Sequence, residues 1–597
     1  MHHFPKGNDA FSFTCSTGQV SFRWLSPNLA PAYLIPLLIL MKIKPSNYFN
    51  RPALYCLGII YLLGIPGCKP KVSSVPQWSQ LELSFEAQNQ YKNPYADQDV
   101  WAWFVNTKGD SLIRPAFWDG GNTWKIRFSP PDANMTWQWQ LYCSTDDPGL
   151  NTKSGSLQSV PYEGENKLTK QGTLKMSPGK RNITFGDNTP FLMVGDTPWS
   201  MPYRATLEQT KMYAEDRQKK GFNTALLIAV QPDQNAVGPD QRNTVGGFAR
   251  GFEDLKDGHL TKLNPAYFQT LDSMLAILYE KEIIPVLAPL AFGYGWKGAH
   301  ALGASANAEE YSRFCKYLVA RYGSRPACWL ITLDGNGMAP GVEPAGETIE
   351  KWDAYRQPVG LHYNPCDDFL ATWAVKDSSH CFHYNRTHQE KKWLDFQWAQ
   401  TGHDGLHLYH KVERMHQNLP VKAVMNGEPT YEAMNEGKSG LGWWQGEDAW
   451  NQLMHGGTMG VIYGAACLWQ WKITPDETGW EPWTNAPFSW RQALDFEGSR
   501  YVGHISRAFE GFDFTDMKVR KDLTDSGFGL LAKEGVFYIA YLPKGGEIDI
   551  KNVPDLPYYW FDPVKGVFVP TQYSGTRSSF KSPDKNQPWV LVLGKKK

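Results

Sequence analysis

The sequence lacks an excess of charge of either sign, since 60 Lys and Arg residues balance 60 Asp and Glu residues. A balanced chain has no electrostatic reason to bind nucleic acid or an acidic membrane surface. The sequence also contains no Walker A motif, no H-E-x-x-H motif and no paired C-x-x-C motif. Nucleotide hydrolysis and zinc chemistry are therefore unsupported, and we expect neither a metal nor an organic cofactor.

Tryptophan, in contrast, is plentiful. The 597 residues include 25 Trp, and aromatic residues make up 14% of the chain. A chain of this length predicts about two to four domains. Trp side chains stack on flat apolar faces such as those of sugar rings, although they also build the cores of β-sandwiches. The composition therefore favours a sugar as one class of ligand.

Residues 41–68 have the composition of an export signal, with a basic segment followed by a short apolar run. The apolar run is too short for a comfortable membrane span. Ile65-Pro66-Gly67-Cys68 resembles a bacterial lipobox, which implies a lipoprotein signal peptide at 41–67 and lipidation of Cys68. We therefore expect an exported lipoprotein, periplasmic or held at the outer membrane or cell surface by the lipid anchor alone. Residues 1–40 look like a gene-model extension, with a long unstructured leader as the alternative.

A short tether rich in Pro, Ser and Lys follows, at residues 68–77. Six further cysteines lie beyond it, and their scatter matches no small disulfide framework. Export would permit disulfides, but the spacing predicts no pairing. These cysteines are Cys143, Cys315, Cys328, Cys366, Cys381 and Cys467.

Residues 78–170 contain short alternating segments broken by Gly, Pro and Asn, such as residues 100–105, 124–128 and 137–141. This pattern predicts a small antiparallel β-sandwich. The order N-P-Y, F-W-D-G-G-N-T-W-K-I-R-F-S-P and W-Q-W resembles the immunoglobulin-like domain ahead of many bacterial glycoside hydrolase barrels. The resemblance implies an immunoglobulin-like β-sandwich packed on the next domain, with carbohydrate binding as the less favoured alternative.

A strand–loop–helix rhythm runs through residues 171–504. Helical patterns cover residues 206–220, 265–281 and 306–322. Eight apolar strands alternating with helical segments predict a central (β/α)8 TIM barrel, although the sixth run could be a helix on periodicity alone. The eight runs are residues 191–197, 222–230, 283–290, 328–334, 358–363, 393–400, 421–425 and 461–471.

Two carboxylates stand out where these strands end. Asp334 ends the fourth strand, and Glu428 follows the seventh, after Asn426-Gly427 and before Pro429, which prevents the strand from continuing. Residues just past the carboxyl ends of barrel strands are the usual site of chemistry. Cleavage of a glycosidic bond needs two carboxyl groups in different protonation states. One gives a proton to the leaving oxygen, and the other attacks the anomeric carbon or activates water.

Five motifs carry a resemblance to the apiosidase-like glycoside hydrolases. The resemblance implies that Asp334 is the proton donor and Glu428 the nucleophile. The motifs are G-D-T-P-W (195–199), W-L-I-T-L-D-G-N (329–336), H-Y-N-P (362–365), W-L-D-F-Q-W-A-Q-T-G-H (393–403) and N-G-E-P-T-Y-E (426–432). The same resemblance implies a sugar-binding subsite, and two tryptophans at the end of the predicted eighth strand are added to it. The residues are Asp196, Trp199, His362, Gln400 and His403, with Trp469 and Trp471 from the eighth strand.

Glu432, four residues after Glu428, is the alternate candidate for the catalytic carboxylate. Its other expected roles are to support its loop or to hydrogen-bond a sugar hydroxyl. The T-L-D-G-N segment at 332–336 departs from the G-G-D plus basic residue of many relatives, which leaves the identity of the sugar open. For Asp334 and Glu428, a carboxyl separation of about 5–5.5 Å would favour retention and about 6.5–9.5 Å inversion.

Residues 505–597 return to short strands and predict a small C-terminal β-sandwich. Within them W-F-D-P (560–563) resembles a strand of the small β-domain that follows such barrels. A structural or sheet-capping role is implied, with glycan binding as the alternative.

The sequence therefore predicts a glycoside hydrolase that cleaves a terminal or branch bond of a complex polysaccharide by a two-carboxylate, retaining mechanism. The alternative is a non-catalytic glycan-binding surface lipoprotein. A lyase is a further rival, but the sequence shows no matching cluster of Tyr, His, Arg and Lys.

Overall fold

The computed structural model describes residues 73–232, 250–292, 301–335, 337–363, 386–477, 485–570 and 577–597. Residues 71–597 form one compact unit. The predicted signal peptide and its lipidation site Cys68 lie outside the described residues, as do Cys366 and Cys381. The described cysteines, Cys143, Cys315, Cys328 and Cys467, are free thiols. No helix in the described part of the chain has both the length and the apolarity needed to cross a bilayer.

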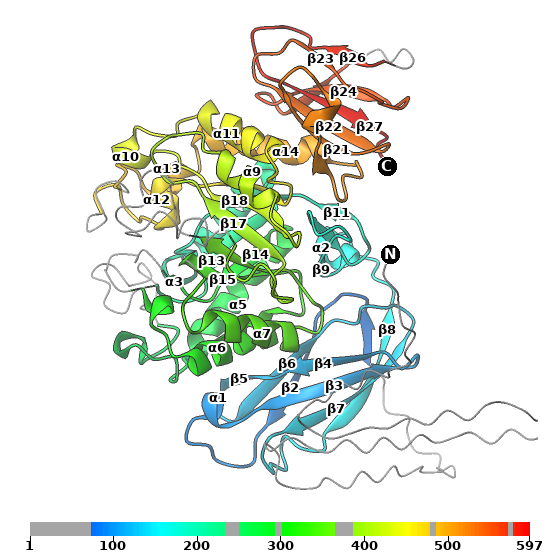
Figure 1. Cartoon of the computed structure of the whole chain (residues 1–597). Helices are drawn as coiled ribbons and strands as arrows, with labels where there is room; N and C mark the ends of the chain where they lie inside the picture. The colour runs from blue at the N-terminus through cyan, green and yellow to red at the C-terminus, as the bar shows by residue number, and fades with distance from the viewer. Residues whose placement is uncertain are drawn as a thin grey trace, which may run out of the picture. The chain divides into compact units, whose positions relative to one another are not determined.

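The N-terminal region consists of two β-sheets that face each other (Figure 1). The rings of Phe104 and Phe128, one from each sheet, stack with centroids 4.0 Å apart, and Trp137 is completely buried beside them. One sheet has the order β1-β8-β7-β3-β4, with β1 Ser73–Pro76, β8 Ser154–Val160, β7 Thr136–Cys143, β3 Val100–Asn106 and β4 Ser111–Pro115. The other has the order β2-β6-β5, with β2 Leu81–Glu86, β6 Thr123–Phe128 and β5 Phe117–Gly120.

The sandwich begins earlier than the sequence predicts. Residues 73–76, assigned to the tether, form β1 and pair in parallel with β8. Val75 is buried in the sandwich core, which explains why this short Ser- and Pro-containing segment is ordered. The tether prediction is therefore wrong for these four residues.

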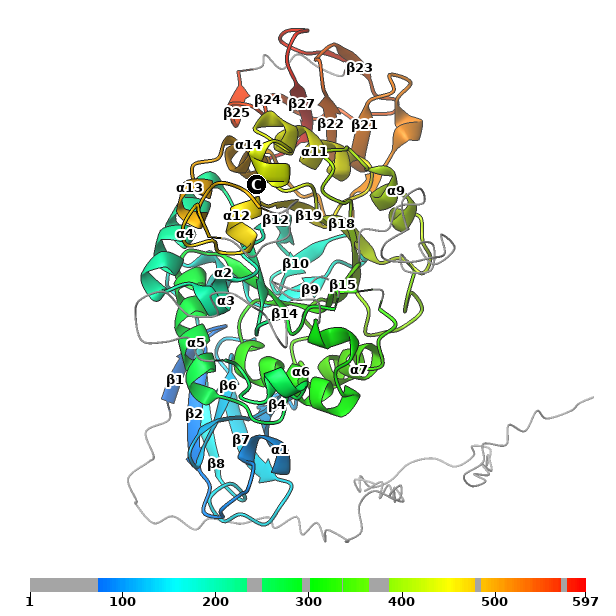
Figure 2. The same cartoon turned by 90° about the vertical axis from the view of Figure 1, so that its left-hand side faces the viewer.

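The central domain is an eight-stranded parallel barrel, as predicted (Figure 2). Every residue of its strands is buried, which is why the strands read as continuous apolar runs. The first and last strands of the sheet order, β18 and β19, lie next to each other and close the barrel. The amide of Met459, directly before β19, donates a hydrogen bond to the carbonyl of Val424 on β18 at 3.2 Å. The order is β18-β17-β16-β15-β14-β13-β12-β19, with β12 Met193–Asp196, β13 Thr224–Ile228, β14 Ile284–Ala288, β15 Cys328–Gly335, β16 Val359–Tyr363, β17 Phe396–Gln400, β18 Ala423–Glu428 and β19 Gly460–Tyr463.

The sixth run is a strand, β17, which settles its ambiguous periodicity. The eighth strand is shorter than predicted, because β19 ends at Tyr463 and the chain then turns into the short helix α12, Ala466–Trp469. Trp469 therefore lies on a helix and not at a strand end.

Helices surround the barrel strands (Figure 2). Helix α4 starts with a capping box formed by Thr206 and Gln209, and it ends at Gly221, which has φ 99°. Pro265 opens α5, where a missing amide proton costs nothing. The helices are α3 Met201–Arg204, α4 Leu207–Lys220, α5 Pro265–Glu280, α6 Ala308–Tyr322, α7 Val342–Trp352, α9 His410–His416, α10 Met434–Gly437, α11 Trp443–Met454, α12, α13 Trp490–Ala493 and α14 Glu497–Phe509.

Two shorter elements frame the barrel. A small antiparallel sheet of β9 (Leu174–Met176), β10 (Ile183–Phe185) and β11 (Pro190–Phe191) precedes β12. Helix α14 runs through the predicted boundary at residue 505 and packs against α4 and α11 of the barrel.

The C-terminal strands form a six-stranded antiparallel sheet and a two-stranded ribbon with a shared core around Trp560, Phe580 and Trp589. The larger sheet has the order β20-β21-β22-β27-β24-β25, with β20 Lys518–Val519, β21 Gly529–Lys533, β22 Phe537–Leu542, β27 Trp589–Gly594, β24 Tyr558–Asp562 and β25 Val567–Val569. The ribbon pairs β23 Glu547–Asp549 with β26 Ser579–Lys581.

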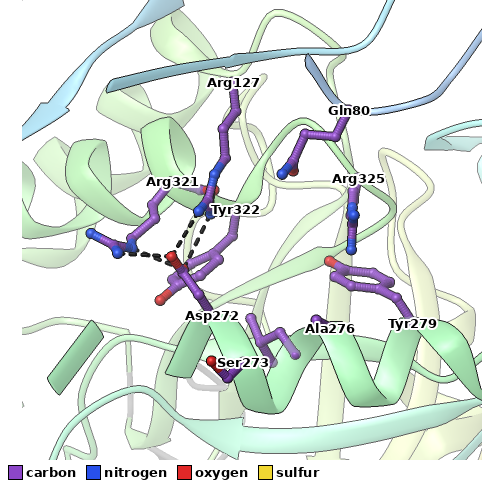
Figure 3. A pocket seen from close by; sticks show the side chains of 10 residues that line it. Gln80, Arg127, Asp272, Ser273, Ala276, Tyr279, Arg321, Tyr322 and Arg325 are labelled. Atoms are coloured by element: carbon purple, nitrogen blue, oxygen red, sulfur yellow. Dashed lines mark hydrogen bonds and ion pairs between the residues drawn. The ribbon is translucent and has the colours of Figure 1, made fainter. Parts of the chain in front are cut away.

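Ion pairs fix the N-terminal sandwich to the barrel (Figure 3). Arg127 of β6 and Arg321 of α6 both reach the carboxylate of Asp272 on α5, at 2.7 and 2.8 Å. Burial tends to raise the pKa of Asp272, but the two guanidinium groups outweigh it and hold this pKa below its usual range. Arg114 of β4 also donates to the carbonyl of Val319, at 3.0 Å. The sandwich therefore packs on α5 and α6, and the sequence predicted only that it would pack on the barrel domain.

Candidate active site

Asp334 lies at the end of β15 in an unusual backbone conformation. Its φ is 56°, in the left-handed region that residues other than Gly rarely adopt. The pairing of β15 with β16 shifts register between Leu330 and Thr332 and again between Thr332 and Gly335. Such irregularities redirect side chains, and strained backbone gathers at functional sites. Here they accompany an aspartate residue that is only 9% exposed.

Glu428 lies at the end of β18, next to a second irregularity. Ala399 pairs with Asn426 but Gln400 pairs with Glu428, so Gly427 is an extra residue in the strand. A Cβ atom at residue 427 would lie 2.9 Å from Cδ2 of His362 and 2.8 Å from the ring of Trp398. Only glycine fits there without displacing its neighbours. Gly427 therefore leaves room for the side chains of His362 and Trp398 just before β18 presents Glu428.

His362 of β16 lies between the two carboxylates. Its Nδ1 accepts a hydrogen bond from the Asp334 amide at 3.3 Å, so the ring proton is on Nε2. Nε2 lies 3.4 Å from Oε2 of Glu428, and Nδ1 lies 3.9 Å from Oδ1 of Asp334. Complete burial lowers the pKa of His362 to about 4, so the imidazole is neutral near pH 7.

Two other side chains hold Glu428 through hydrogen bonds. Nε2 of His403 lies 3.1 Å from Oε1 of Glu428. The Tyr431 hydroxyl also interacts with this carboxylate, and it accepts a hydrogen bond from Nε1 of Trp199 at 2.8 Å. Burial tends to raise the pKa of Glu428, but His403, His362 and Tyr431 outweigh it and hold this pKa below its usual range. Glu428 is therefore the ionised member of the pair.

Asp334 is the protonated member. Burial, reinforced by the negative charge of Glu428, raises its pKa well above its usual range, and an interaction with Gln400 opposes this only in part. One carboxylate oxygen of each residue and a ring nitrogen of His362 lie within 4.8 Å of one another. Two neighbouring carboxyl groups in opposite protonation states are the arrangement of an acid paired with a nucleophile or base.

A family comparison identifies this barrel. The model of the family described as apiosidase-like, catalytic domain, matches residues 177–516, more than half of the chain. The chain belongs to the apiosidase-like family of glycoside hydrolases. A second model, for a domain of unknown function, matches residues 74–144 of the sandwich. A comparison with curated protein sequences gave no match.

Solved structures of glycoside hydrolases share the fold of this apiosidase-like chain. One from Bacteroides vulgatus ATCC 8482 has a TM-score of 0.62 at 16% identity, covering 87% of this chain and 99% of its own. A family 5 glycoside hydrolase from the same organism has a TM-score of 0.55 at 19% identity, covering 72% and 94%. A third, described only as a glycoside hydrolase, has a TM-score of 0.56 at 18% identity, covering 72% and 98%. At these identities the similarity concerns the fold.

The Asp334, His362 and Glu428 cluster of this glycoside hydrolase has the spacing of a metal site as well. A bound cation would need both carboxyl groups deprotonated and His362 as a nitrogen ligand. The buried Asp334 instead favours its proton, and Nδ1 of His362 is already engaged by a backbone amide. These features fit proton transfer better than cation binding.

The structure brings five of the predicted site residues together around Glu428: Asp334, His362, Gln400, His403 and, through Tyr431, Trp199. Each of them follows or ends a barrel strand, as the sequence predicts.

Asp196 is placed differently. Its carboxylate is completely buried and pairs with Nε of Arg217 on α4 at 2.5 Å, while the Thr197 amide donates to it at 2.8 Å. The carboxylate holds β12 to α4, because its oxygens bind Arg217 and the backbone amide of Thr197 and do not face a substrate.

Glu432 and Trp471 are also held by the protein. Glu432 accepts hydrogen bonds from the amides of Gly442 and Gly498 and from the Tyr463 hydroxyl, at 2.8, 3.2 and 2.7 Å. It therefore supports its loop, which is one of the three roles that the sequence left open. Trp471 is completely buried and stacks on Trp490 at 4.5 Å, so it is part of the core and cannot contact a sugar in this structure.

Tyr431 is a site residue that the sequence did not single out. It stands three residues after Glu428 within N-G-E-P-T-Y-E, and its ring packs 4.9 Å from that of His403. The available signal was its place in the same motif as Glu428, because a hydroxyl three residues away can reach back to that carboxylate.

Proposed function

We propose that this enzyme hydrolyses a terminal or branch glycosidic bond of a complex polysaccharide with retention of anomeric configuration. The observation that carries the proposal is that Asp334 and Glu428 are buried together at the ends of β15 and β18, with His362 between them and one oxygen of each within 4.8 Å of the other. Burial and neighbouring charge displace their pKa values in opposite directions, upward for Asp334 and downward for Glu428. The apiosidase-like family match supports a branch sugar as the class of substrate.

The first step uses both carboxyl groups in the states that the structure favours. The protonated Asp334 gives its proton to the glycosidic oxygen, while ionised Glu428 attacks the anomeric carbon and forms a glycosyl ester as the leaving group departs. In the second step, Asp334, now ionised, takes a proton from water, and the resulting hydroxide displaces Glu428 from the sugar. One oxygen of Asp334 lies within 4.8 Å of one oxygen of Glu428, and this closeness supports double displacement, because inversion needs a wider gap for water.

His362 and His403 support the nucleophile in this scheme. His362 lies beside Glu428, with Nε2 3.4 Å from Oε2, and its low pKa keeps the imidazole neutral near pH 7. Trp199, Gln400 and His403 are the residues that we assign to the sugar-binding subsite.

We also propose that a lipid on Cys68 holds the exported enzyme at the periplasmic or outer face of a membrane. Cys68→Ser should then move the protein from the membrane fraction to the soluble fraction.

The test is a screen of pectic, algal and host glycans for a released monosaccharide. Asp334→Ala and Glu428→Gln should each lower turnover by several orders of magnitude while leaving the thermal unfolding midpoint nearly unchanged. Glu432→Gln is the matched control, because it should lower stability more than chemistry. Loss of turnover with Glu432→Gln but not with Glu428→Gln would overturn the assignment. Proton NMR of the first-formed sugar would show an inverted anomer if the mechanism were not retaining.

A further inference from the structure

The outer face of the five-stranded sheet is unusually apolar. Trp103, Val105 and Ile113 are 47%, 36% and 39% exposed there, whereas the solvent face of an antiparallel sheet normally carries polar residues. A groove of about 470 Å³ crosses this face. It is lined by side chains from β3, β7 and β8, among them Trp103, Gln138, Gln140 and Tyr142.

Strand pairing arranges these side chains in rows across the sheet. Trp103 pairs with Gln140, and Gln140 pairs with Ser154, so one row runs from an indole through an amide to a hydroxyl. The next row repeats the order with Val105, Gln138 and Ser156. The groove thus has an apolar side on β3 and a hydrogen-bonding side on β8.

An aromatic cluster closes one end of the rows. The ring of Tyr142 stacks on Trp101 with centroids 5.9 Å apart and lies 6.2 Å from Trp103. Exposed rings of this kind offer flat apolar area at a low cost in side-chain entropy.

The groove is separate from the catalytic carboxylates. The side chains of Trp103, Gln138 and Gln140 alternate with buried residues of β3 and β7, so they point away from the three-stranded sheet that Arg127 fixes to α5. None of the residues that line it is charged, although charged residues make up 20% of the chain. A charged ligand would find no partner there, but a neutral ligand with one apolar face and many hydroxyls would find both stacking surfaces and hydrogen-bond partners.

We infer that this groove binds a chain of neutral sugars, which holds the polysaccharide substrate to the enzyme away from the catalytic centre. The apolar C–H face of a pyranose ring stacks on Trp103, and its hydroxyls exchange hydrogen bonds with Gln138, Gln140 and the serines of β8. The inference rests on the enzyme being a glycosidase, but it does not depend on which carboxylate performs which step.

Affinity electrophoresis in gels that contain a single polysaccharide tests the inference. The probes are galactomannan, xyloglucan, arabinan and laminarin, with polygalacturonate as the charged comparison. The full chain carries Glu428→Gln so that the probe is not degraded, and Trp103→Ala, Gln140→Ala or Val567→Ala is added to it. Val567 is the matched control, because it is 46% exposed but lies on the C-terminal sheet.

We expect at least one neutral polysaccharide to retard the parent protein. Trp103→Ala should weaken its association about tenfold and Gln140→Ala severalfold, since losing a central aromatic contact costs more than about 1 kcal/mol. Val567→Ala should have no effect. Circular dichroism and the unfolding midpoint establish that each variant is folded.

Three results would overturn the inference: no retardation by any neutral probe, equal retardation of Trp103→Ala and its parent, or stronger binding of polygalacturonate. A change from dimer to monomer in sedimentation of Trp103→Ala would show instead that the groove is covered by a second copy of the chain. The proposed catalytic roles are contradicted by a different observation, which is release of sugar by the Glu428→Gln protein. The two failures can therefore be distinguished.

Discussion

Nε2 of His403 lies 3.1 Å from Oε1 of Glu428, at the point where β17 and β18 deliver their last residues to the same side of the barrel. His403 contributes more than His362 or Tyr431 to lowering the pKa of Glu428. This contact links the loop after β17 to the ionisation of the proposed nucleophile.

His403→Ala should therefore raise the pKa of Glu428 and move the acidic limb of the kcat/KM profile to higher pH. The sign follows because Glu428 acts as a carboxylate, and activity is lost as pH falls through its pKa. The measurement is kcat/KM against pH for the enzyme and the variant. His455→Ala is the control, since this histidine stacks on Tyr409 outside the site and should leave the limb in place. An unmoved limb in His403→Ala would show that the contact does not set the charge of Glu428.

The alkaline limb should report Asp334. Its pKa is raised by burial and by the charge of Glu428, so the proton that it donates is lost only well above the usual pH for an aspartate. With Asp334→Ala, substrates whose leaving group needs no protonation should lose much less kcat than natural glycosides, because general acid catalysis contributes about 10²–10⁴-fold. Aryl glycosides with leaving groups of graded pKa make the measurement. An equal loss for all of them would contradict the role of Asp334 as the acid.

Several features of this site were predictable from sequence because they follow from local chain chemistry. Glu428 stands where an apolar run meets Asn-Gly and Pro, and Asp334 where a run meets Asp-Gly, so the ends of β18 and β15 could be located without a structure. Fully buried parallel strands, however, carry no alternation that tells which way a polar residue at the end will point. Asp196 and Asp334 both end strands, yet one faces Arg217 and the other His362.

The aromatic residues were misplaced for a related reason. The run from Val461 to Trp471 is apolar throughout, and its composition does not reveal that β19 ends at Tyr463 and that α12 begins three residues later. The burial of Trp471 depends on Trp490, which is distant along the sequence from the strand ends that guided the prediction.

Tyr431 supplies a third test of the site. Tyr431→Phe removes the hydroxyl that interacts with Glu428 and that accepts the hydrogen bond from Trp199. Hydrogen bonds to charged groups contribute about 1.5–3 kcal/mol, so kcat/KM should fall about 10- to 100-fold. The acidic limb should move in the same direction as with His403→Ala, and by less. Tyr501→Phe is the control, because Tyr501 packs on Trp443. Wild-type kinetics for Tyr431→Phe would remove this residue from the site.

The ion pair between Asp196 and Arg217 gives the last prediction. Asp196→Ala would leave the completely buried Arg217 without its completely buried charge partner, and breaking such a pair costs about 3–5 kcal/mol of folding free energy. Burial tends to lower the pKa of Arg217, but Asp196 and Asp216 outweigh it and raise that pKa. Without Asp196 the side chain would still carry its charge, because an arginine guanidinium keeps its proton in proteins. Urea unfolding followed by Trp fluorescence makes the measurement.

Asp216→Ala is the matched control, since Asp216 also contacts Arg217 but keeps 23% of its side chain exposed, and it should cost less stability. KM for the substrate separates the structural role from the sugar-binding role that the sequence predicted for Asp196. A raised KM at unchanged stability in Asp196→Ala would place this carboxylate in the sugar-binding subsite. Reduced stability with KM nearly unchanged would confirm that it acts by holding β12 to α4, because its carboxylate faces α4 and the adjacent backbone in the folded chain.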